Sequence, residues 1–94
     1  MDTGAQHRNL TNAIERDLMD RHGPLIADEA LRAALGYSSM GAFRQALSRG
    51  RLPIPVFSMP QRRGKFALVK DVAAWLVEQR GRAAATSQEA NVKK

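Results

Sequence analysis

The stretch that decides the fold runs from residue 28 to residue 50 and reads DEALRAALGYSSMGAFRQALSRG. In its first part the apolar residues Leu31, Ala34 and Leu35 recur at helical spacing, which is typical of a helix with one buried face. Asp28 stands directly before them and is a good N-cap. The pattern predicts a short helix over Glu29–Leu35.

The second part of the stretch predicts another short helix after a tight turn. Gly36 suits the left-handed conformation that ends a helix, and Ser39 can cap the next one. This second helix is expected over Met40–Arg49, with Gly50 closing it. Its apolar face consists of Phe43, Ala46 and Leu47. The residues left on its other faces, free to meet a ligand, are Gly41, Arg44, Gln45, Ser48 and Arg49.

Upstream of this helix pair the sequence predicts one more helix and a short extended segment. Thr11 or Asn12 can cap a helix over Asn12–Arg21, which Gly23-Pro24 ends. The apolar run Leu25–Ala27 is expected to be extended.

Downstream, the sequence predicts a β-hairpin and a last helix. Leu52–Pro55 is expected to be extended because each proline disfavours helix in the residue before it. The runs Pro55–Met59 and Lys65–Val69 are β-prone and flank Pro60–Gly64, a five-residue connection that ends in glycine. A helix is then expected from Lys70 or Asp71 to about Arg80, closed by Gly81.

Length and composition predict one folded domain with flexible ends. The chain has 94 residues, of which 44% are hydrophobic, enough for one modest core. Residues 1–10 are expected to be flexible, residues 11–82 to form the domain, and residues 83–94 to be a disordered tail with too few apolar residues to offset its ordering entropy. The expected fold class is mainly α with a small β-hairpin.

Charge is distributed unevenly along the chain. The formal net charge is +6, from 15 Lys and Arg against 9 Asp and Glu. No acidic residue lies between Ser39 and Lys70, whereas this window holds seven basic ones: Arg44, Arg49, Arg51, Arg62, Arg63, Lys65 and Lys70. The second helix of the pair, its exit and the hairpin are therefore expected to share one positive surface, as neutralisation of phosphates requires.

Individual residues on this surface have a functional and a plain interpretation. Ser38, Ser39 and the helix N-terminus can bind a phosphate, or Ser39 can act only as the cap. Arg44 and Gln45 can read guanine and adenine edges, or be solvated helix residues. Arg62, Arg63 and Lys65 can contact phosphates or the minor groove, or protect the edge of an exposed hairpin.

Other function classes have little support in the sequence. Cysteine is absent, His7 and His22 lack partners for a metal site, and no Ser, His and Asp stand in a recognisable catalytic pattern. Phe43 and Trp75 have aliphatic neighbours at helical spacing and are expected in the core. We expect a soluble, cytoplasmic protein that is not an enzyme, with no metal, cofactor, small-molecule ligand or membrane partner.

The order of these motifs resembles the MerR-like winged helix-turn-helix group, which includes excisionases, AlpA-type regulators and pyocin-activator proteins. The matching residues are Ala34–Ser38, Phe43, Arg49–Pro53 and Asp71–Leu76. The resemblance implies DNA binding through Ser39, Arg44, Gln45 and Arg49 on the helix and through Arg62, Arg63 and Lys65 on the wing. The helix Asn12–Arg21 precedes the usual start of that fold. The 94 residues show no pattern of the long C-terminal coiled coil and effector domain of full MerR regulators, so a small-molecule sensor role is not expected.

The sequence thus predicts a protein that binds double-stranded DNA with sequence preference, as a transcriptional regulator or a recombination directionality factor. Small size favours a homodimer or cooperative multimer on DNA. The alternative is an adaptor that binds an acidic protein through the basic face, and RNA binding is a third possibility that lacks an aromatic stacking platform. The candidate DNA-binding residues are Ser38, Ser39, Arg44, Gln45, Ser48, Arg49, Arg51, Arg62, Arg63 and Lys65.

Overall fold

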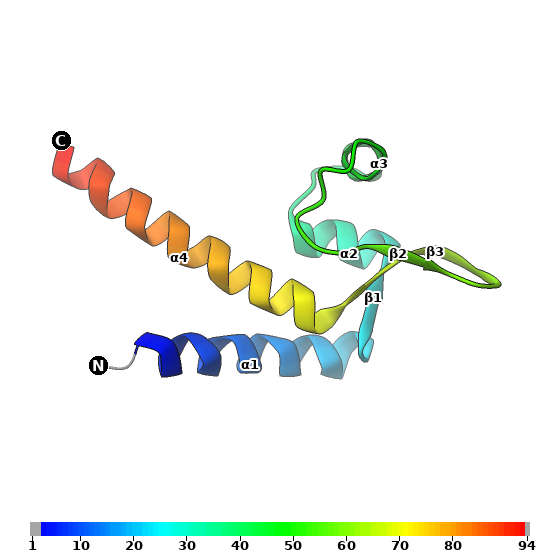
Figure 1. Ribbon diagram of the computed structural model, residues 1–94, viewed down its shortest axis with the longest axis horizontal. Helices are drawn as coiled ribbons and strands as arrows, with labels where there is room; N and C mark the ends of the chain where they lie inside the picture. Colours follow the sequence, from blue (N-terminus) through cyan, green and yellow to red (C-terminus); the bar gives the residue numbers. More distant parts are fainter. Residues whose placement is uncertain (1–2, 94) are drawn as a thin grey trace.

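The chain folds into helices around a small antiparallel sheet (Figure 1). The computed structural model describes the backbone of residues 3–93 and the side chains of residues 4–84. Its elements in chain order are α1 (Thr3–His22), β1 (Leu25–Ala27), α2 (Asp28–Leu35), α3 (Met40–Ser48), β2 (Phe57–Met59), β3 (Arg62–Leu68) and α4 (Val69–Lys93). The strand order is β1-β3-β2. The predicted mainly helical class with a small amount of β structure is confirmed, and the sheet has a third strand, β1, beside the predicted hairpin.

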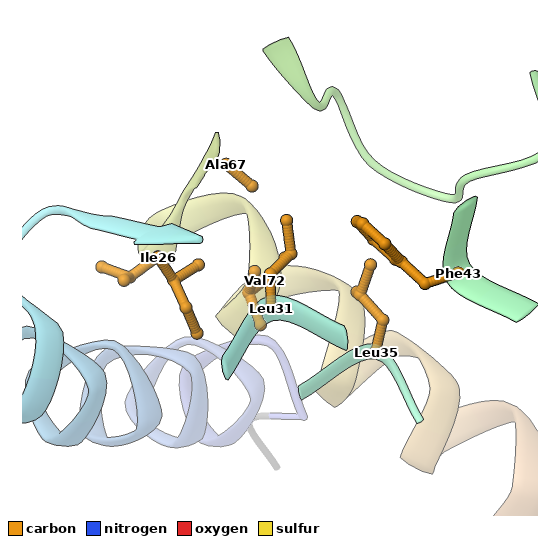
Figure 2. Close-up of a cluster of buried hydrophobic side chains, with 7 residues drawn as sticks. Ile26, Leu31, Leu35, Phe43, Ala67 and Val72 are labelled. Atoms are coloured by element: carbon orange, nitrogen blue, oxygen red, sulfur yellow. The ribbon is translucent and has the colours of Figure 1, made fainter. Parts of the chain in front are cut away.

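The core is built from the helix pair, two strands and the first turn of α4. Its buried side chains converge between α2, α3, the sheet and α4 (Figure 2). Phe43 is buried, as expected, and Trp75 is partly buried and packs against the same cluster. The buried cluster consists of Ile26, Leu31, Leu35, Phe43, Ala67, Val69 and Val72.

The two outer helices are longer than the sequence pattern predicted. The expected cap at Thr11 or Asn12 is wrong, because α1 begins at Thr3 and the Thr11 hydroxyl donates 2.9 Å back to the carbonyl of His7 inside the helix. Likewise α4 does not end near Arg80. A mid-helix glycine costs only about 1 kcal/mol relative to alanine, and the alanines after Gly81 are the best helix formers.

These helix limits change the expected ends of the domain. Residues 3–10 belong to α1, and residues 83–93 of the predicted tail continue α4. Residues 1, 2 and 94, the remainder of the two stretches expected to be flexible, lie outside the described residues. Helices α1 and α4 also pack against each other.

The short strand β1 ties the hairpin to the helical body. It pairs with β3 in antiparallel register, Leu25 with Leu68 and Ala27 with Phe66. The amide of Val69 donates to the carbonyl of Pro24 at 2.9 Å and extends this pairing by one bond. The sequence predicted an extended segment here but not its partner.

Asp28 does not cap α2. The N-cap is Ala27, which has extended backbone (φ −143°, ψ 157°) and makes no side-chain cap bond. Asp28 is the first helical residue, at φ 49°, and its Oδ1 accepts a hydrogen bond from the backbone amide of Lys65 at 3.1 Å. The carboxylate therefore holds the hairpin against the start of α2 instead of satisfying the helix amides.

The hairpin turn is tighter than predicted. Met59 pairs with Arg62, so the connection is Pro60 and Gln61, and Gln61 takes a positive φ of 62°. The prediction of a five-residue connection over Pro60–Gly64 is therefore wrong. Between this pair and the next one, Phe57 with Phe66, β2 has one residue and β3 has residues 63–65. Such an irregularity bends a strand, which explains why a glycine stands inside β3.

A side chain at position 64 should destabilise the fold. Its φ is +105°, and a Cβ there would lie 2.6 Å from Oδ2 of Asp28. We expect Gly64→Ala to lower the free energy of unfolding by about 2–4 kcal/mol, from backbone strain and from displacement of the Asp28 carboxylate. Urea denaturation measures this change.

Gly50→Ala is the matched control for this substitution. Gly50 also has a positive φ, 65°, but a Cβ there meets nothing within 4 Å. Gly50→Ala should lower the free energy of unfolding by only about 1–2 kcal/mol, the cost of holding a residue with a Cβ in the left-handed conformation. Equal destabilisation of the two variants would contradict a close approach of Asp28 to Gly64.

Candidate functional site

The turn between α2 and α3 is fixed by caps that the sequence predicted. Gly36 ends α2 at φ 85°, and its amide donates to the carbonyl of Ala33 at 3.1 Å. Ser39 is the N-cap of α3, with its Oγ accepting from the amide of Ala42 at 3.0 Å. The Ser39 hydroxyl still has its proton to donate, so capping does not prevent the predicted phosphate contact.

Arg32 also holds this turn, a role that sequence reasoning missed. The Arg32 side chain is half-buried; Nη1 donates to the carbonyl of Tyr37, and Nε donates to Oε2 of Glu29 at 3.0 Å. Glu29 neutralises the guanidinium, which is therefore a positioning group and adds nothing to the positive surface. The spacing of Glu29 and Arg32, one helical turn apart, was the available signal.

Helix α3 is anchored by one buried side chain and turns the predicted contact residues outward. Phe43 is 1% exposed, and its ring meets Tyr37 edge to face at a centroid distance of 6.0 Å. The helix is closed by Gly50 at φ 65°, as predicted, with the amide of Arg51 donating to the carbonyl of Ala46 at 2.8 Å. The exposed candidates on and around α3 are Ser38, Ser39, Arg44, Gln45, Ser48, Arg49 and Arg51.

The hairpin carries the three remaining candidates, all exposed. Arg62 and Arg63 begin β3 next to the turn, at the outer end of the hairpin. Lys65 lies further along β3, where its Nζ donates to Oγ of Ser58 on β2 at 2.9 Å. This partner is a neutral hydroxyl, and Lys65 forms no ion pair among the described side chains, while the Asp28 carboxylate lies at its backbone amide.

No carboxylate forms an ion pair with the cations of α3 and the hairpin within the part of the chain whose side chains are described. The ion pairs found there, Arg32 with Glu29 and Arg82 with Glu78, lie outside the window from Ser39 to Lys70. Figure 1 shows α3 and the hairpin in the same half of the molecule along its long axis, away from both termini. These cations are therefore available to an anionic partner.

A shallow pocket of about 250 Å³ beside α3 brings some of the candidates together. Arg49 and Arg51 line it with Gln45, and its other lining residues are Tyr37, Ala42 and Ala46. Arg44, Ser48 and Ser38 do not line it. The sequence placed Arg49 and Arg51 on one surface, but only the fold of the chain after Gly50 shows that they meet at one hollow.

Metal ligation and membrane insertion find no support among the described residues. No group of three His, Asp or Glu side chains lies close enough to hold a metal ion there. None of the helices over residues 3–93 has the length and apolar character needed to cross a membrane.

Comparison of the chain with protein-family models, curated proteins and solved structures finds no match.

Proposed function

We propose that the protein binds double-stranded DNA as a winged helix-turn-helix, with α3 as the recognition helix and the β2–β3 hairpin as the wing. The observation that carries this proposal is the set of exposed cations on α3, its exit and the hairpin, which form no ion pair among the described side chains and lie in the half of the molecule away from the termini. Clustered cations of this kind neutralise phosphates and release their counterions.

The arrangement of the elements supports the same proposal. Two short helices, α2 and α3, are joined by a tight turn, as in motifs that place the second helix in the major groove. The hairpin follows α3 and is held to the body by β1 and by the carboxylate of Asp28. A wing fixed in this way can add contacts beside the groove that α3 occupies.

The biological role within this proposal is transcriptional regulation or direction of recombination. The resemblance of Arg49–Pro53 and Asp71–Leu76 to the MerR-like group supports both roles equally. The two differ in where the DNA site lies and which partner is contacted. An assay of promoter output beside an assay of excision separates them.

Duplex binding by the wild-type protein tests the proposal. A preferred duplex is selected from a random pool, and its dissociation constant is measured by fluorescence anisotropy at several salt concentrations. We expect the logarithm of the association constant to fall with the logarithm of the salt concentration with a slope of about −4 to −6, because each neutralised phosphate contributes about −0.9.

Absence of duplex binding at low salt, or binding that does not respond to salt, would overturn the proposal. A footprint on the selected duplex also reports stoichiometry. One short recognition helix buries little surface, so we expect a footprint that holds two or more copies.

A further inference from the structure

On the outward face of α3, small residues lie on either side of one long side chain. Gly41, Gln45 and Ser48 follow one another along the helix surface, one turn apart, on the side away from the buried Phe43. Gly41 has no side chain. The Ser48 hydroxyl donates to the carbonyl of Gln45 at 3.2 Å, so it folds back on its own helix. Gln45 alone extends from the middle of this face.

The fold does not require a glycine at position 41. A Cβ there would meet the Ser39 Oγ at 3.7 Å, an ordinary van der Waals distance, and the residue does not have the positive φ that characterises Gly36, Gly50 and Gly64. Glycine is also a poorer helix former than alanine. The missing side chain therefore leaves room for something outside the molecule.

We infer that Gly41 and Ser48 let the backbone of α3 lie close to the floor of the major groove, and that Gln45 between them is the central base-reading residue. This inference rests on the proposed DNA binding and refines it. A glutamine amide can pair with both N6 and N7 of adenine, but only when the helix axis approaches closely enough for its short reach. Arg44 and Arg49 extend from the two flanks of the same face, where phosphates lie.

Enlarging residue 41 tests this close approach. We expect Gly41→Ala to keep the melting temperature of the wild type or raise it slightly, and to weaken binding of the selected duplex about tenfold. Gly41→Leu should weaken it by about a hundredfold or more, because a larger side chain holds the helix further from the bases.

Gly81→Ala is the matched control. Gly81 lies within α4, and a Cβ there meets nothing within 4 Å. This variant should raise the melting temperature by a few degrees, on the order of 4 °C, and leave the duplex affinity unchanged.

Gln45→Ala completes the test on the base-reading side. It should abolish the preference at one base-pair position of the selected site, while Arg49→Ala should weaken all sequences alike. Unchanged affinity of Gly41→Leu would overturn the inference, and so would a lower melting temperature of Gly41→Ala, which would show that the fold needs the glycine. Failure of the proposed function is distinct, since the wild type itself would then bind no duplex.

Discussion

Replacing Phe43 by alanine should lower the free energy of unfolding by about 3–5 kcal/mol, among the largest single effects this fold allows. Phe43 is 1% exposed and is the only fully buried side chain of α3 in the described structure. It belongs to the buried cluster that contains Leu35, and its ring meets the ring of Tyr37. Alanine would leave a cavity at the place where α3 joins the core.

The size of this loss matters because small domains have a total stability of only about 5–15 kcal/mol. We expect urea denaturation of Phe43→Ala to show a much lower midpoint. Duplex affinity should fall in parallel, since α3 then has no buried anchor to fix its orientation.

Gln45→Ala provides the control on the same helix, because Gln45 is exposed and its truncation should change stability by no more than about 0.5 kcal/mol. Phe43→Met, which nearly preserves volume, should cost less than about 1.5 kcal/mol. A destabilisation below about 1 kcal/mol for Phe43→Ala would contradict the buried anchor.

Local signals were sufficient to predict the helix pair. Gly36 adopts the left-handed backbone expected of it, Gly50 closes α3 as expected, and Ser39 caps α3 through its Oγ. Each of these features depends on residues within one or two helical turns. The apolar spacing that predicted the buried side of α3 is equally local, and Phe43 lies where it predicts.

Contacts distant in sequence were not accessible to such signals. Asp28 is a good N-cap by type, yet its carboxylate bonds to the amide of Lys65, 37 positions away. Whether this carboxylate bonds to the first amides of α2 or to the amide of Lys65 depends on where the hairpin lies. The hairpin position depends in turn on β1 pairing with β3, for which the run Leu25–Ala27 gave only an extended backbone.

In the candidate site, too, local signals predict some features, whereas others depend on contacts between residues distant in sequence. Helical spacing separates exposed from buried residues, and all ten candidates are exposed as their positions suggest. Spacing does not reveal that Arg32 also donates to the carbonyl of Tyr37, or that Arg51 and Arg49 line the same pocket. Those facts depend on the path of the chain through the turn and after Gly50.

Replacing Arg62, Arg63 and Lys65 together by alanine should weaken duplex binding about 10²- to 10³-fold at moderate salt. The same change should make the slope of log K against log salt shallower by about 2–3, because each phosphate that is no longer neutralised removes about 0.9 from it. The folded state should be little affected, because all three residues are exposed and none forms an ion pair within the described structure. Fluorescence anisotropy over a salt series measures both quantities.

The control must remove the same charge from another part of the molecule. Arg8, Arg16 and Arg21 are exposed on α1, and their replacement by alanine also takes the formal net charge from +6 to +3. Charges beyond a Debye length of about 8 Å are largely screened at physiological salt, so this variant should bind nearly as well as the wild type. Equal weakening in both variants would assign the attraction to net charge alone. Weakening confined to the hairpin variant requires phosphates close to β2 and β3, which is the contact that a wing makes and a generally basic surface does not.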